Sequence, residues 1–74
     1  MENQFTAVFE RDGDWWVGYV LELPGANTQG ATLEEARENL REAISLVLEA
    51  NRELAEREIG SRTVVKEGIS VTTA

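Results

Sequence analysis

Hydrophobic and polar residues alternate along the first part of the chain. Between residues 4 and 11, Phe5, Ala7 and Phe9 fall on one side of an extended backbone, and the intervening residues fall on the other. This period of two predicts a β-strand. The Asp12-Gly13-Asp14 sequence that follows is typical of a hairpin turn. We therefore expect the next apolar run to return antiparallel to the first strand.

That run covers residues 15–21 and is rich in aromatic and β-branched side chains, which are enriched in strands. Pro24-Gly25 then suits a type II turn, because proline fits its second position and glycine accepts the positive φ of its third. A short third strand, at about residues 26–29, fits before the break at Gly30.

The sequence Thr32-Leu33-Glu34-Glu35 matches a capping box and predicts the start of a helix. In this motif the Thr32 hydroxyl accepts the Glu35 N–H, and the Glu35 carboxylate accepts the Thr32 N–H. The helix is predicted to continue to about residue 57 or 58, and Gly60 is a favourable stop. An apolar stripe at helical spacing predicts which face is buried: Ala36, Leu40, Ala43, Ile44, Val47, Leu48, Leu54 and Ala55.

Two further β segments are predicted after the helix, at residues 62–66 and 69–73, with Gly68 as a turn or bulge between them. The predicted order is β-β-β-α-β in one domain, residues 1–74. This is an α+β fold, with one helix packed on one face of a small, mainly antiparallel sheet. Five residues are expected to shape the passage from sheet to helix: Pro24, Gly25, Gly30, Thr32 and Glu35.

The chain is short, with 74 residues, and it contains neither cysteine nor histidine. Domains of this size bury only about 60% of the surface of the unfolded chain and usually need further support. Disulfides and thiolate or imidazole metal sites are excluded by composition. We therefore expect support from a second subunit, in a homo-oligomer such as a dimer or tetramer.

The sequence offers little for catalysis. The carboxylates of Glu10, Asp12, Asp14 and Glu22 could in principle hold a divalent metal, but nothing else in the chain completes a coordination shell. Aspartates are in any case favoured in hairpin turns for local hydrogen bonding. The serines lack a histidine base, and the glycines lack the spacing of a phosphate loop. We expect no metal, no cofactor and no enzymatic activity.

The net charge is -7, from 14 acidic and 7 basic residues. Direct nucleic-acid binding usually needs a basic face, and none is predicted. The negative charge favours a basic protein partner, although it can also serve only to keep a small protein in solution. No apolar run is long enough to span a membrane, and the first four residues do not resemble a signal peptide. A cytoplasmic location is expected.

Two adjacent tryptophans, Trp15 and Trp16, lie in the second predicted strand and should point to opposite faces. A single helix covers only one face of a sheet, so one indole is left on the uncovered face. Exposed aromatic residues are typical anchors of protein interfaces. The alternative is that this tryptophan packs against the terminal strand or a loop.

The chain resembles the HicB family of antitoxins over about residues 5–48. The likeness lies in several short elements, whose order and spacing are together fairly specific. They are the paired strands at 5–11 and 16–20, Glu22-Leu23-Pro24-Gly25, Thr28-Gln29-Gly30, and Thr32-Leu33-Glu34-Glu35-Ala36 followed by Asn39 and Ala43.

This resemblance implies a HicB-like fold, a reduced relative of the ribonuclease H sheet with one helix packed on it. It also implies a role in a prokaryotic toxin–antitoxin system, in which the domain binds a HicA-type toxin. Such toxins are small basic ribonucleases that cleave mRNA, and the antitoxin covers the toxin's catalytic histidine. The contact candidates are Trp15, Trp16 and Tyr19, with charge from Glu10, Asp12, Asp14 and Glu22.

Two departures from the family pattern are visible. Ala26 stands where many family members have cysteine, and we interpret it as a tolerated small residue. Family members usually continue into a helix-turn-helix or ribbon-helix-helix domain, whereas this chain ends at Ala74, so binding to its own promoter is not expected. A HicB-like oligomeric assembly module without a toxin is the alternative function, and a residual nuclease is the least favoured one.

Overall fold

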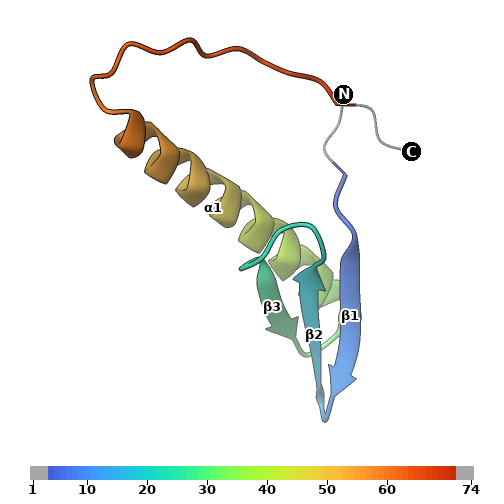
Figure 1. The fold of residues 1–74 in the computed structure, drawn as a ribbon. Coiled ribbons are helices and arrows are strands. Elements are labelled where there is room, and N and C mark those ends of the chain that lie inside the picture. The colour runs from blue at the N-terminus through green and yellow to red at the C-terminus, as the bar shows by residue number, and fades with distance from the viewer. Residues whose placement is uncertain (1–3, 72–74) are drawn as a thin grey trace.

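The computed structural model describes residues 4–71 and contains three strands and one helix in that range. The strands are β1 (Ala7–Asp12), β2 (Trp15–Val20) and β3 (Asn27–Gly30), and the helix is α1 (Leu33–Ile59). They form an antiparallel sheet in the order β1-β2-β3, with α1 crossing one face of it (Figure 1). The α+β class and the single helix on one face are confirmed.

The hairpin between β1 and β2 forms as its alternating pattern predicts. The register pairs Ala7 with Val20 at one end and Asp12 with Trp15 at the other. Gly13 lies in the connecting turn with φ of 62°, a value that glycine adopts without the steric cost of a Cβ. The second turn has the predicted type II features, because Gly25 has φ of 94° and the Ala26 N–H donates to the Leu23 carbonyl at 3.2 Å.

The helix begins at the predicted cap, with one difference. The Glu35 N–H donates to the Thr32 hydroxyl at 3.0 Å, as expected, but the Glu35 carboxylate accepts the Ala31 N–H, at 2.9 Å, and not that of Thr32. The carboxylate therefore binds the amide one residue earlier in the chain. At the other end the Gly60 N–H donates to the Glu56 carbonyl at 3.1 Å, and the positive φ of Gly60, 56°, ends α1 there.

The core lies where the first half of α1 packs on β2 and β3. Its buried residues are Val20, Ala26, Ala36 and Leu40, with Phe9, Ile44 and Val47 among the half-buried residues around them. Two strand glycines permit this close packing. A Cβ on Gly30 would lie 2.6 Å from the Ala36 nitrogen, and a Cβ on Gly18 would lie 2.9 Å from the Phe9 ring.

The expected strands after the helix are absent from the described residues. Residues 62–71, which we call the tail, form no strand, and the rest of the predicted 69–73 segment lies outside the described range. The reason is that the 27-residue helix carries the chain beyond the end of the sheet, and the tail then runs back at a distance from it (Figure 1). Its β-branched side chains consequently stay exposed, with Val65 at 85% and Ile69 at 86%.

Candidate functional site: the open face of the sheet

The two faces of the sheet are distinguished by the register. Phe9 and Gly18 are paired across β1 and β2, and a Cβ on Gly18 would also touch Leu40 of α1, so this pair faces the helix. Their neighbours in each strand point to the opposite side. We call that side the open face. Its residues on β1 and β2, together with the residue that follows β2, are Val8, Glu10, Asp12, Trp15, Val17, Tyr19 and Leu21.

The structure decides which tryptophan points outward. Trp15 lies on the open face and is 49% exposed. Trp16 lies on the helix side, is half-buried, and has the Arg11 guanidinium 5.5 Å from its ring centroid. Arg11 and Trp16 are a cross-strand pair, which explains why the cation sits over this ring. Of the two indoles, only that of Trp15 belongs to the open face.

Apolar side chains form a continuous patch on the open face. Tyr19 is 37% and Leu21 60% exposed, while Val8 and Val17 are half-buried between the larger residues. No helix or strand in the described part of the chain covers them. Val8 was not among the predicted contacts. It lies two residues before Glu10 in the same strand, and this alternation predicts that both side chains lie on the same face.

Carboxylates border this patch along β1. The Tyr19 hydroxyl donates to Glu10 at 3.2 Å, and Asp12 lies opposite Trp15 at the hairpin end. Desolvation, followed by the hydrogen bond to Glu10 and its negative charge, raises the pKa of Tyr19 above its ordinary value of 10.0. The phenol therefore remains a neutral hydrogen-bond donor at physiological pH, held against an acidic neighbour.

The remaining predicted contact residues lie elsewhere. The carboxylate of Glu22 accepts the Thr6 N–H at 2.7 Å and the Thr6 hydroxyl at 2.6 Å, and these hydrogen bonds hold the pKa of Glu22 below its usual value. Glu22 thus ties the start of the hairpin to its end. Asp14 is exposed in the hairpin turn. The structure gathers Glu10, Asp12, Trp15 and Tyr19 on one face. Trp16 lies on the helix side, and Asp14 and Glu22 lie at opposite ends of the hairpin.

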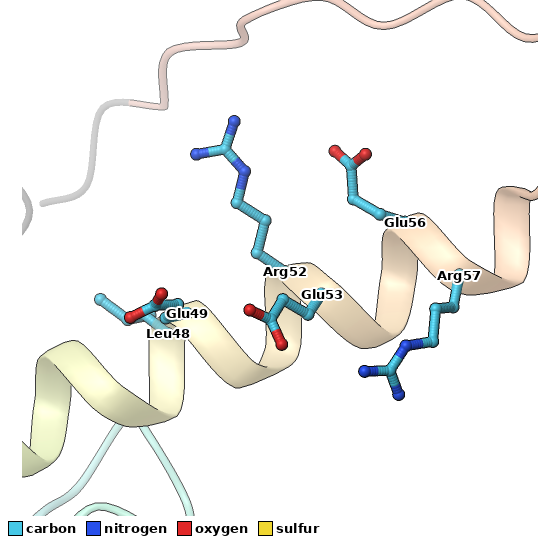
Figure 2. Close-up of a pocket in the computed structure, with 6 residues that line it drawn as sticks. All are labelled: Leu48, Glu49, Arg52, Glu53, Glu56 and Arg57. Carbon is cyan, nitrogen blue, oxygen red and sulfur yellow. The ribbon is translucent and has the colours of Figure 1, made fainter.

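A second surface feature is an open hollow along the last turns of α1, lined by Leu48, Glu49, Arg52, Glu53, Glu56 and Arg57 (Figure 2). Figure 2 shows Arg52 and Glu56 projecting to one side of the helix and Arg57 to the other. Glu56 lies 3.4 Å from Lys66 of the tail. Within residues 4–71 no three potential ligating side chains of histidine, cysteine, aspartate or glutamate cluster around a common point. In that range no helix has the length and apolar character needed to cross a membrane.

Comparison with known proteins identifies relatives with one shared designation. The chain is 41% identical over 68 residues to a UPF0150 protein of Archaeoglobus fulgidus, a match that covers 88% of this chain and 99% of the relative. It is 49% identical over 47 residues to a UPF0150 protein of Thermotoga maritima, covering 61% of this chain and 63% of that relative. A UPF0150 protein of Synechocystis is 43% identical over 51 residues, with 66% and 69% covered. No family model and no solved structure matches the chain.

Proposed function

The chain belongs to the UPF0150 family of prokaryotic proteins, and on this premise we propose that it is a HicB-like antitoxin that binds and sterically blocks a basic, mRNA-cleaving HicA-type toxin. The single observation that best supports this proposal is the open face. There a small chain of net charge -7 exposes an aromatic and aliphatic patch next to carboxylates. In this role the protein contributes contact rather than chemistry.

The composition of the open face suits a protein partner. Large aromatic side chains provide much contact area at little entropic cost, and they are enriched among the residues that dominate binding energy. Trp15, at the hairpin end of this surface, is its most exposed aromatic residue, and the Tyr19 hydroxyl donates to Glu10. A carboxylate border attracts a cationic partner and raises the encounter rate. Inhibition then follows from occlusion of the toxin's active site.

A second candidate is supported by a different observation. Besides the open face, the described residues expose apolar side chains on the tail and on the far half of α1, including Val65, Ile69 and Leu54. Such exposure suits a HicB-like assembly module whose partners are copies of itself and which has no toxin. The two candidates differ in whether a basic partner protein exists.

The test uses the short, basic, histidine-containing protein encoded beside this gene, if one is present. We expect the two proteins to form a complex whose affinity falls as salt increases, because exposed charge pairs are screened. Replacing Trp15 with alanine should weaken the complex roughly 30-fold, the loss typical of an aromatic residue that dominates the binding energy of an interface. The measurement is titration calorimetry together with rescue of growth in cells that express the partner.

Leu54→Ala is the matched control, because Leu54 is a comparably exposed apolar residue (56%) on the helix, away from the open face. It should bind like the wild type. If the neighbouring protein does not bind, or if no such protein is encoded, the antitoxin proposal is wrong. If the Trp15→Ala and wild-type proteins bind the partner with equal affinity, the open face is not the contact surface.

A further inference from the structure

We infer that the tail of one copy of this chain adds as a strand to the free edge of β1 in a second copy. This inference concerns assembly of the chain with itself and does not depend on a toxin. It joins three features that the fold leaves incomplete: an unpaired strand edge, an apolar groove beside that edge, and a β-patterned segment without a partner.

The outer edge of β1 has free backbone groups. The Leu21 N–H donates to the Thr6 carbonyl at 3.0 Å, so the peptide groups of Thr6 point toward β2. In an antiparallel pair this orientation alternates, and the N–H and C=O groups of Ala7, Phe9 and Arg11 therefore point away from β2. No described residue bonds to them. Such an edge is a ready template for an additional strand.

The opposite edge of the sheet is less suitable. By the same alternation, β3 directs the backbone groups of Asn27 and Gln29 outward. The Gln29 carbonyl is already bound, because the Asn39 side chain of α1 donates to it at 3.0 Å. With only four residues in β3 and one outward carbonyl occupied, β1 is the edge that remains available over its full six residues.

An apolar groove runs beside the β1 edge on the helix side. It is lined by Ala7 and Phe9 of β1 and by Arg37, Leu40, Arg41 and Ile44 of α1. The groove exists because α1 packs mainly over β3 and β2 and leaves the helix side of β1 only partly covered (Figure 1). A fourth strand next to β1 would direct every second side chain over this groove.

The tail has the composition of the missing strand. Val64, Val65, Ile69 and Val71 are β-branched and between 44% and 86% exposed. Residues 63–71 make no backbone hydrogen bond within the described part of the chain. Among the described residues, the one side-chain hydrogen bond or ion pair of this stretch joins Lys66 to Glu56, two exposed groups whose pairing contributes little. The tail is therefore held only weakly where it now lies.

Chain length favours a second copy over closure within one chain. Val47 is the last helix residue packed against the core, so residues 48–59 project about 18 Å beyond it at 1.5 Å per residue. The ten residues of the tail span about 33 Å at most. At about 3.3 Å per residue, returning along the projecting helix takes about six residues, 60–65, so Val64 and Val65 would be used before the chain reached the sheet. The tail of another copy has no such constraint and can pair along all of β1.

The absence of cysteine makes the test direct. One chain carries a cysteine at an exposed β1 position (Ala7→Cys or Arg11→Cys), and a second chain, distinguished by mass, carries one in the tail (Val65→Cys, Glu67→Cys or Ile69→Cys). After mixing and oxidation, we expect a disulfide between unlike chains for at least one combination, detected by mass spectrometry. The control pairs the β1 cysteines with Arg52→Cys on α1, which should not cross-link above background.

Solution mass provides the second measurement. The wild-type chain should show at least twice its monomer mass of 8.2 kDa by light scattering, and Ile69→Asp should reduce this to the monomer. The tail makes no core contact, so this variant cannot fail simply by unfolding the sheet. Leu54→Asp, on the exposed helix surface, should keep the wild-type mass. Trp15→Ala should also keep it, which separates this inference from the proposed toxin contact.

Three results would overturn the inference. The first is a wild-type chain that stays monomeric at every concentration tested. The second is no disulfide between unlike chains above the Arg52→Cys background in any combination. The third is loss of association in Leu54→Asp but not in Ile69→Asp. The last result would place the contact between copies on the helix instead of on β1.

Discussion

Replacing Gly30 with alanine tests how closely the helix and sheet are packed. Gly30 is buried at the end of β3, opposite Trp16 in the register, and its φ is not positive, so backbone conformation alone does not require glycine. The restriction comes from space. An added Cβ would lie 2.6 Å from the Ala36 nitrogen, 3.0 Å from the Ala36 Cα and 3.1 Å from the Glu35 carbonyl carbon.

All three neighbours are backbone atoms of the first helical turn, so no side-chain rotation can relieve the clash. The helix start and β3 must move apart, which loosens the packing of the first helical turn on the sheet. Overpacking of this kind costs about 1–3 kcal/mol. The total stability of a chain of this length is about 4–11 kcal/mol. We therefore expect Gly30→Ala to remove about 2–3 kcal/mol, a large share of the total.

The assay is urea unfolding followed by tryptophan fluorescence at one fixed protein concentration, because association would make stability concentration-dependent. Gly68→Ala is the matched control: an added Cβ there meets no atom within 4 Å, and the φ of Gly68 is not positive. It should change stability by less than about 0.5 kcal/mol. If Gly30→Ala unfolds within that same margin of the wild type, the helix does not pack on β3 as closely as described.

Three further changes probe other contacts. Leu40→Ala truncates the one large, fully buried side chain in the described residues and should lower the free energy of unfolding by about 2–5 kcal/mol. Leu54→Ala, at the exposed end of α1, should lower it far less. Equal losses would refute the assigned core. Thr32→Ala removes the acceptor of the Glu35 N–H and should lower the free energy of unfolding by about 1 kcal/mol in the same assay. An unchanged urea midpoint would contradict this role of Thr32. The pKa of Glu22 is lowered in the folded state by its hydrogen bonds from Thr6, so its contribution is present above its ordinary value of 4.5 and is lost as pH falls through the lowered pKa. Glu22→Gln should accordingly be less stable than the wild type at pH 7, and the difference should shrink in acid; a difference that stays constant with pH would contradict this assignment.

Local features of the fold were predictable because they depend on residues close together in the chain. The phase of β1 and β2, the glycine turns at Gly13 and Gly25, and the Thr32 cap each follow from interactions within a few positions. The same holds for the expectation that Trp15 and Trp16 point in opposite directions. The capping carboxylate shows the limit of such reasoning, since Glu35 binds the amide of Ala31 and not that of Thr32.

The sequence by itself determined the element types from residues 4 to 60 and the existence of one apolar sheet face without a helix to cover it, because periodicity and turn chemistry are local. Only the tertiary structure decided that Trp15 lies on that face, that Glu22 binds Thr6 sixteen residues away, and that residues 62–71 form no strand within one chain. The physical reason is that a segment with strand propensity forms a strand only where a sheet edge is within reach. Because α1 is longer than the sheet beneath it, it carries the tail away from the sheet edge of the same chain.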